Sequence, residues 1–458
     1  MSGAGFPSGF RFGVATSAQQ IEGAAREDGR GESVWDRFAS TPARVKDRST
    51  SDVACDHYHR WRGDIALMRE LGVNAYRFST GWSRVLPTGE GAANEAGLAF
   101  YDRLVDGLLE AGITPFLTLN HWDLPQALDE KGGWGSRDTV DAFVAYADVL
   151  SRRLGDRVKH WITHNEPWCV ATLGHEQGAH APGRRDAAEA LRVAHHLLLS
   201  HGRAVPVLRA NSAGAEVGLT TMMTAAEAAS DSDADRDAAR QFDGLFNRWF
   251  LDPLQLGWYP ADVIADHHRH GRLAAPELPF VHDGDLKAIA VPTDFLGINY
   301  YSRAVMQAGP DGRPVGVPQA PPEDLTEMGW EVRPQGFFDV LTRVARDYAP
   351  KQVYVTENGA AFVDPPAVDG LIADPRRVDY LRTHLLAAQR AIEAGVPLAG
   401  YFAWSLMDNW EWAEGYTKRF GLYAVDFESQ QRTAKHSARF YRDVVAAHAV
   451  PTVVPQYS

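Results

Sequence analysis

Residues 163–168 read Thr-His-Asn-Glu-Pro-Trp and directly follow the run Val-Lys-His-Trp-Ile of residues 158–162. The β-branched and aromatic side chains of that run predict a buried strand. The strand ends abruptly in Asn165 and Glu166, so two polar side chains stand at its carboxyl end. Pro167 disfavours the α region for the residue before it, and we therefore expect Glu166 to lie on extended backbone.

A second strand ends in the same way far downstream. Residues 353–355, Val-Tyr-Val, predict another buried strand, and Thr-Glu-Asn-Gly follows at residues 356–359. In a barrel of parallel strands, all carboxyl ends meet at one face, where the active sites of such barrels lie. Glu166 and Glu357 would meet there, and two carboxyl groups at one site are what hydrolysis of a glycosidic bond requires.

A recurring unit of helix, glycine and apolar strand predicts the rest of the fold. Residues 64–71 have helical spacing, Gly72 ends them, and a strand follows; the same order recurs around Gly112 and Gly395. Such repetition favours parallel strands, and closing them into a barrel removes the exposed edges. The eight expected strands are residues 10–16, 73–78, 113–119, 158–163, 216–220, 294–300, 353–356 and 400–404. We predict an α/β protein, a single (β/α)8 TIM barrel domain over residues 1–458 with long βα loops. The segment of residues 302–350, with its proline and glycine clusters, is expected to form one active-site loop that carries Trp330.

Composition limits the partners. The chain has 458 residues, of which 45% are hydrophobic and 23% charged, as in ordinary globular proteins. A net charge of −13 argues against nucleic acid and against anionic membranes as partners. Without a secretory signal or a long apolar span, and with Cys55 and Cys169 expected as free buried thiols, the sequence predicts a cytoplasmic protein. The oligomeric state is left open.

Histidine clusters do not predict a metal. They lie at residues 57–59, 195–196 and 267–270, the last interpreted as a polar helix face. None has the His-Glu-x-x-His spacing, and no acidic residue completes a ligand set. We expect neither a metal nor a cofactor.

The motifs around Glu166 and Glu357 resemble the two signatures of the family-one glycoside hydrolases, the β-glucosidase family. The resemblance extends from Phe10 to about His436, and one departure is His164, where the family more often has an apolar or aromatic residue. It implies a retaining β-glucosidase that acts on small β-glucosides and cello-oligosaccharides, with Glu357 as nucleophile and Glu166 as acid/base. Retention implies carboxyl groups about 5–5.5 Å apart.

The resemblance also implies a role for residues at the other strand ends. Arg77 is expected to contact Glu357 and lower the pKa of its carboxyl, while the Glu357 anion raises the pKa of Glu166. Tyr301 is expected to hydrogen-bond Glu357, and the bond between Trp404 and Ser405 to be cis. The expected substrate-binding residues are Gln20, His121, Trp122, Asn165, Asn299, Tyr301, Trp330, Trp404, Glu411, Trp412 and Phe420.

Individual sugar contacts follow from the same resemblance. Asn165 is expected at the 2-hydroxyl, Gln20 and Glu411 at the 4-hydroxyl, and Trp330 against the aglycone. Because a carboxylate accepts hydrogen bonds from an equatorial or an axial hydroxyl, β-fucosides and β-galactosides are expected as side substrates.

Alternatives remain within and outside enzymes. A 6-phospho-β-glucosidase of the same family carries a serine and basic residues where Glu411 stands here. A catalytically inactive sugar-binding relative typically lacks one of the two glutamates, and a thioglucosidase has glutamine in place of the acid/base. The presence of Glu166, Glu357 and Glu411 favours the β-glucosidase.

Overall fold

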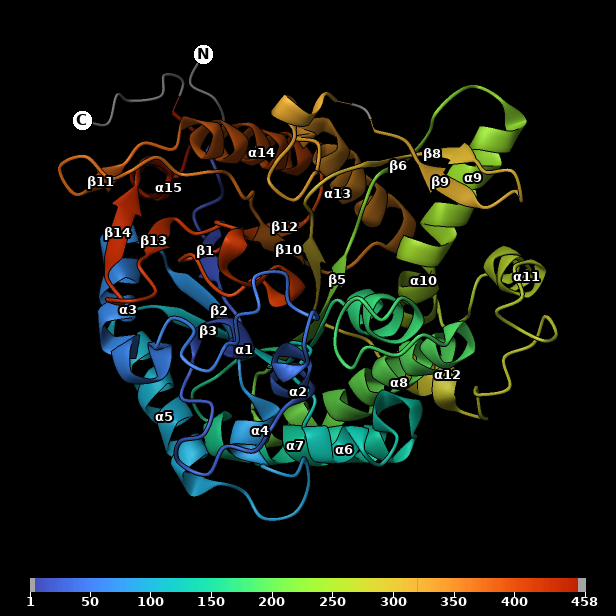
Figure 1. The fold of residues 1–458 in the computed structure, drawn as a ribbon, viewed down its shortest axis with the longest axis horizontal. Helices are drawn as coiled ribbons and strands as arrows, with labels where there is room; N and C mark the ends of the chain where they lie inside the picture. Colours follow the sequence, from blue (N-terminus) through green and yellow to red (C-terminus); the bar gives the residue numbers. More distant parts are fainter. Residues whose placement is uncertain (1–4, 319, 452–458) are drawn as a thin grey trace.

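A closed barrel of eight parallel strands lies at the centre of the structure (Figure 1), which confirms the predicted fold class. The computed structural model describes residues 5–318 and 320–451. The strands follow one another around the barrel in chain order. They are β1 (Arg11–Ala15), β2 (Ala75–Ser79), β3 (Thr114–Asn120), β4 (His160–Asn165), β5 (Glu216–Met222), β7 (Phe295–Asn299), β10 (Val353–Asn358) and β12 (Leu398–Trp404). Each expected strand overlaps one of them.

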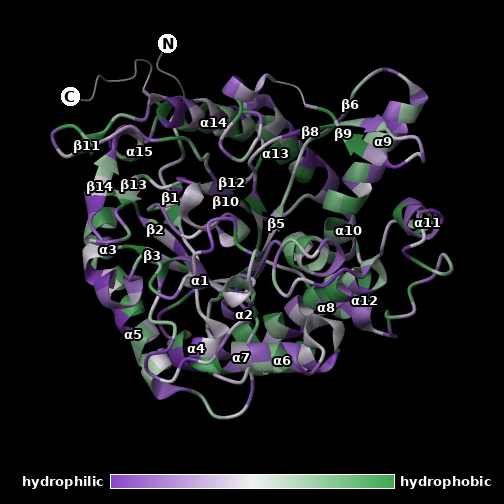
Figure 2. Cartoon of the chain, viewed as in Figure 1, coloured by the Kyte–Doolittle hydropathy of each residue, from purple (hydrophilic) through white to green (hydrophobic). Residues whose placement is uncertain are grey.

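Helices surround the barrel (Figure 1) and turn apolar faces toward it. In α13 the buried side chains Phe337, Val340, Leu341 and Val344 recur at the spacing of one helical face. Figure 2 shows the hydrophobic and hydrophilic residues that alternate along such helices. The long outer helices are α3 (His57–Leu71), α5 (Glu95–Glu110), α7 (Asp138–Leu154), α8 (Ala187–Asn211), α13 (Pro334–Tyr348), α14 (Pro375–Glu393) and α15 (His436–Ala447).

Shorter elements occupy the connections. The helices are α1 (Ala18–Ile21), α2 (Val34–Ser40), α4 (Trp82–Val85), α6 (Gln126–Asp129), η1 (Gly133–Gly135), η2 (Cys169–Glu176), α9 (Asp233–Asp243), η3 (Gly244–Arg248), α10 (Trp249–Gln255), α11 (Ala261–Arg269), α12 (Asp285–Ile289), η4 (Pro322–Asp324) and η5 (Trp412–Thr417). Two small sheets are formed by β6 (Ala226–Ala228), β8 (Ala304–Ala308) and β9 (Pro314–Gly316), and by β11 (Leu371–Ile372), β13 (Tyr423–Val425) and β14 (Arg432–Lys435).

The expectation that residues 302–350 form one loop is wrong in part. The segment contains β8, β9 and the long helix α13. Its proline and glycine clusters mark the turns between these elements, and Pro334 starts α13 because a proline at the first helical position loses no hydrogen bond. The remaining loop does carry Trp330, as predicted.

Aromatic rings fill the barrel interior beneath the strand ends. Phe116 stacks on His160 with ring centroids 4.1 Å apart and meets Tyr354 and Phe402 edge-on. Gly13 leaves room for this layer, because a Cβ there would lie 2.3 Å from the Phe402 ring. The barrel is therefore a packed core, and the open space lies above it at the carboxyl ends of the strands.

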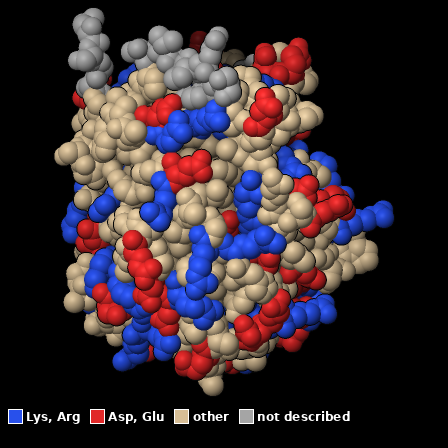
Figure 3. All heavy atoms as spheres, turned by 90° about the vertical axis from the view of Figure 1, so that its left-hand side faces the viewer, with Lys and Arg blue, Asp and Glu red and all other residues tan. Residues whose placement is uncertain are grey.

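Charges of both signs are mixed on the face formed by α3 and α5 (Figure 3). Oppositely charged side chains also pair at α5, where Asp102 and Asp106 each lie 2.7 Å from Arg157. On this face the negative net charge does not form one large field. Over the residues described, none of the helices combines the length and the apolar character needed to cross a membrane.

We predict that Phe116→Ala lowers the free energy of unfolding by about 3–5 kcal/mol, the usual cost of removing a large ring from a well-packed core. Chemical denaturation of wild type and variant measures it. Leu386→Ala, at a position 38% exposed on α14, serves as control and should change the free energy by less than about 0.5 kcal/mol. Equal midpoints for Phe116→Ala and wild type would contradict the packed-interior description.

Candidate active site

Glu166 lies at the point where the chain leaves β4 and turns into η2. Its backbone has a φ of 46°, so the expectation of extended backbone is wrong. Its N–H still donates to the Thr220 carbonyl of β5 at 2.9 Å, while its own carbonyl accepts from the Cys169 N–H at 3.0 Å. The chain must turn from a strand ladder into a helical turn at one residue, and a left-handed conformation does this. Such strain in a residue other than glycine is typical of functional sites.

Glu357 lies near the end of β10 with its side chain buried. Arg77 of β2 donates from Nη1 to Glu357 Oε1 at 2.5 Å, and the Tyr301 hydroxyl donates to Oε2 at 2.5 Å. Both expected contacts are therefore present. The carboxyl of Glu357 is not free to rotate, since each oxygen has a donor from a different strand end.

A chain of amide hydrogen bonds connects the surroundings of the two glutamates. Arg77 can only donate, so its Nη2 identifies the Asn165 atom at 2.6 Å as Oδ1. The Asn165 Nδ2 then faces His121 Nε2 at 3.0 Å, which accepts. Asn299 Nδ2 donates to Asn165 Oδ1 at 3.0 Å and to Glu166 Oε1 at 2.7 Å. Through these bonds Arg77 orients three other side chains, in addition to one carboxyl oxygen of each glutamate.

The two carboxyl groups differ in acidity. Burial raises the pKa of Glu166 to about 8, and the nearby charge of Glu357 adds to this, as expected. Burial also raises the pKa of Glu357 above its ordinary value, although Arg77 and Tyr301 act in the opposite direction. The expected effect of Arg77 is present, but desolvation outweighs it. Because Glu357 has cationic and hydroxyl donors, it is the carboxyl that ionises first.

A cavity of about 500 Å³ lies over the strand ends. It brings together ten of the residues predicted from the sequence, namely His121, Trp122, Glu166, Tyr301, Trp330, Glu357, Trp404, Glu411, Trp412 and Phe420. The cis bond between Trp404 and Ser405 is also present, as expected. Asn165 and Asn299 support the cavity from behind through their bonds to lining residues.

Glu411 enters this cavity from the segment after β12. Gln20, on α1, donates to its Oε2 at 3.4 Å, so the expected pair is assembled. Burial, together with the charges of Glu357 and Glu166, raises the pKa of Glu411 to about 8. Three carboxyl groups therefore share one desolvated space.

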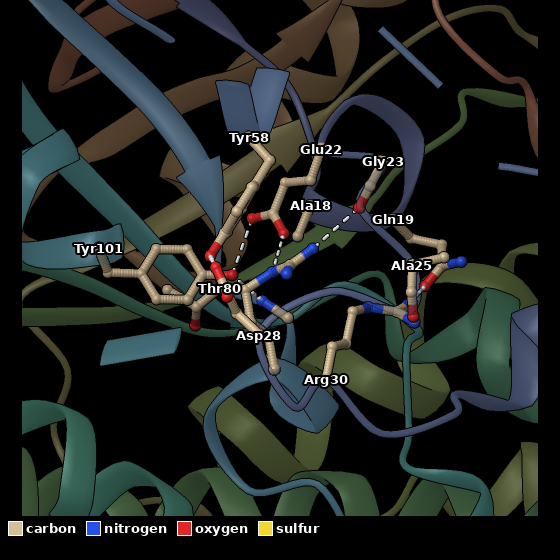
Figure 4. Close-up of polar contacts among 12 residues, drawn as sticks. Ala18, Gln19, Glu22, Gly23, Ala25, Asp28, Arg30, Tyr58, Thr80 and Tyr101 are labelled. Carbon is tan, nitrogen blue, oxygen red and sulfur yellow. Dashed lines mark hydrogen bonds and ion pairs between the residues drawn. The ribbon is translucent and has the colours of Figure 1, made fainter. Parts of the chain in front are cut away.

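An ion pair missed at the sequence level anchors α1, the helix that carries Gln20 (Figure 4). Arg84 donates from Nε to Glu22 Oε2 at 2.7 Å and from Nη2 to the Gly23 carbonyl at 2.9 Å. The Tyr101 hydroxyl donates to the other Glu22 oxygen at 2.7 Å. These residues lie on separate elements and form no motif, so the sequence pattern carries no signal for them.

The outer part of the cavity is likewise formed by residues that the sequence did not predict. It is lined by apolar and aromatic side chains, among them Trp168, Leu173, Met222, Phe242, Phe246 and Met328. Phe242 and Phe246 are four residues apart across α9 and η3, a spacing that places them on one helical face. That spacing was available in the sequence, but it does not distinguish a cavity wall from core packing.

His164 points away from the cavity. Its ring stacks on Phe143 of α7 at 4.4 Å and contacts Ser200 Oγ at 2.8 Å. His267, interpreted as part of a polar face, is instead buried against Trp249. In the described ranges, no three histidine, cysteine or acidic side chains converge as a metal site would require.

Comparison with known proteins agrees with this geometry. The model of the family "Glycosyl hydrolase family 1" matches residues 2–450. Beta-glucosidase A of Thermotoga maritima is 48% identical over 444 residues, covering 96% of this chain and 97% of that protein. A bifunctional beta-D-glucosidase/beta-D-fucosidase of Bifidobacterium breve is 45% identical over 467 residues, covering 97% and 99%.

Solved structures show the same similarity. A beta-glucosidase from Thermotoga maritima in complex with glucoimidazole superposes with a TM-score of 0.93 at 47% identity, covering 97% of this chain and 99% of that one. The family match indicates the same assignment as the sequence identity and the barrel geometry. The chain belongs to glycosyl hydrolase family 1.

Proposed function

We propose that this enzyme is a retaining β-glucosidase that releases terminal non-reducing β-D-glucosyl residues from small β-glucosides and cello-oligosaccharides. The observation that carries the proposal is that Glu166 and Glu357 line one cavity. Both carboxyl groups are buried, and their different surroundings give them different pKa values. The names of the similar proteins, beta-glucosidase among them, support the choice of sugar.

In the first step Glu357, as carboxylate, attacks the anomeric carbon. The bond from that carbon to the glycosidic oxygen breaks, and Glu166 gives its proton to the departing oxygen. A glycosyl ester of Glu357 results, and the aglycone leaves as an alcohol. Arg77 and Tyr301 fit this role, because they hold the Glu357 carboxyl in place and favour its ionised form.

In the second step the ester has removed the charge of Glu357. The pKa of Glu166 then falls, because one of the causes that raise it is that charge. The Glu166 carboxylate takes a proton from water, whose oxygen attacks the anomeric carbon and breaks the ester bond. Glucose leaves with its β configuration, and both glutamates return to their starting states.

The cavity walls fit a pyranose. We assign Asn165 to the 2-hydroxyl and the pair of Gln20 and Glu411 to the 4-hydroxyl, with Glu411 also at the 6-hydroxyl. Trp404 and Trp412 offer aromatic faces for the apolar side of the ring, and Trp330 for the aglycone. Sugar hydroxyls that donate to Glu411 favour its carboxylate form. The name of the Bifidobacterium breve relative supports a side activity on β-fucosides, and we extend the proposal to β-galactosides.

The alternative functions agree less well with the residues of the site. Glu411, buried beside Glu166 and Glu357, would repel a 6-phosphate, and an inactive sugar-binding protein would not need the arrangement of donors around both glutamates. We further propose that the protein works in the cytoplasm, without a metal or cofactor, as the sequence predicts.

We predict that substitutions of the two glutamates have different effects on activity. Glu357→Gly should abolish turnover, and azide should restore it as the α-glycosyl azide, because azide occupies the space of the missing nucleophile. Glu166→Ala should still cleave substrates with good leaving groups, and azide should then give the β-product. Product anomers are read by NMR. The same anomer from both variants would show that the roles are assigned wrongly.

We predict a bell-shaped pH dependence of kcat/KM. Glu166 must hold its proton in the first step, so activity on a substrate with a poor leaving group should fall as pH rises through about 8. Glu357 must be ionised, so activity should also fall as pH drops through its pKa, which lies above the ordinary value for glutamate. A dinitrophenyl glucoside, whose departure needs no proton, is the control and should lose less activity on the alkaline side. An equal loss for both substrates would count against Glu166 as the acid.

We predict a strong preference for the neutral sugar. A 6-phosphate brings about −1.5 to −2 charges to the position of Glu411, so kcat/KM for cellobiose should far exceed that for cellobiose 6-phosphate. Glu411→Gln should lower the ratio of kcat/KM for cellobiose to kcat/KM for cellobiose 6-phosphate. A wild-type preference for the phosphorylated sugar would instead favour the 6-phospho-β-glucosidase.

A further inference from the structure

The hydrogen-bond chain from Arg77 determines which oxygen of Glu166 can carry a proton. Arg77 only donates, so Asn165 presents Oδ1 to it and to Asn299. Asn299 must therefore present Nδ2, and the same Nδ2 lies 2.7 Å from Glu166 Oε1. The opposite side of that amide agrees, because the Thr356 hydroxyl donates to Asn299 Oδ1 at 2.7 Å. Oε1 is thus an acceptor, and the acid proton of Glu166 belongs on Oε2.

Cys169 lies next to that second oxygen. Its Sγ is 3.3 Å from Glu166 Oε2, and its backbone N–H donates to the Glu166 carbonyl at 3.0 Å. Cys169 opens the π-helical segment η2, a conformation that is rare in proteins and frequent at functional sites. The side chain is buried and lines the cavity. Burial and the charge of Glu166 raise the pKa of the thiol well above its ordinary range, so it remains an S–H group.

We propose that Asn299 directs the acid proton of Glu166 to Oε2, and that Cys169, the partner of that oxygen, acts as a positioning residue for proton transfer. The inference rests on the acid/base role proposed for Glu166. The Asn299 amide donates to Oε1 and so disfavours a proton on that oxygen. The thiol contacts Oε2 and is both a weak hydrogen-bond donor and a weak acceptor.

The thiol suits this position because its hydrogen bonds are weak. When Glu166 holds its proton, the thiol sulfur is a poor acceptor and does not compete with the glycosidic oxygen for that proton. After the proton has moved to the leaving group, the S–H can donate to the Oε2 carboxylate. In the second step Oε2 takes a proton from water, and the S–H turns away. The sulfur forms no covalent bond and keeps its own proton throughout.

The test is the alkaline limb of kcat/KM for phenyl β-glucoside. Because the S–H favours the carboxylate, Cys169→Ala should raise the pKa of that limb by about half a pH unit, a small shift expected of a weak donor. Cys169→Ser keeps a donor, and its limb should lie below that of Cys169→Ala. With a dinitrophenyl glucoside, which needs no acid, the alkaline side of the kcat/KM profile should shift less in either variant than it does with phenyl β-glucoside.

Cys55→Ala is the matched control. Cys55 is also buried, and its Sγ donates to the Asp408 carbonyl at 3.2 Å rather than to either glutamate, so the alkaline limb should stay at the wild-type pH. An unchanged limb in both Cys169 variants would overturn the proposal, as would an equal shift in Cys55→Ala. Glu166→Ala separates this failure from a failure of the proposed function. If that variant loses phenyl glucoside activity but keeps dinitrophenyl glucoside activity, the acid role stands whatever the Cys169 variants show.

Discussion

The hydrogen bonds of Arg77 hold the active site together. An arginine side chain has donors and no acceptor, so every group that it hydrogen-bonds must present an acceptor atom. From β2 it fixes one oxygen of Glu357 and the amide of Asn165, and through Asn165 it fixes Asn299 and one oxygen of Glu166. The orientation of the site thus follows from one buried cation that has no alternative hydrogen-bonding pattern.

Desolvation then gives the carboxyl groups their different chemistry. Glu166, Glu357 and Glu411 line one cavity, and burial of their side chains is the largest cause of the raised pKa of each. Each negative charge also makes the next one harder to form. Arg77 and Tyr301 favour ionisation at Glu357, so Glu166 keeps its proton until the chemistry removes the charge of Glu357. Burial, which destabilises charge, is what makes a carboxyl group a useful acid near neutral pH.

Local sequence rules succeeded where one pattern dominated and failed where tertiary contacts competed with it. The eight strands were predictable because buried strands of a parallel barrel are continuous apolar runs with polar residues after them. The backbone of Glu166 was not, because Pro167 excludes only one region, and bonds to Thr220 and Cys169 select among the others. Similarly, the turn residues of segment 302–350 concealed α13, whose apolar positions recur at helical spacing.

The amino-acid sequence alone established the barrel, the two glutamates and their neighbours at the strand ends, because these are properties of short segments and of their order along the chain. It could not establish the acidities, the outer cavity wall or the anchoring of α1 by Glu22 and Arg84. Those arise from side chains that are distant in sequence and meet only after the barrel closes. Burial and hydrogen-bond direction are properties of that assembled neighbourhood, and no single segment contains them.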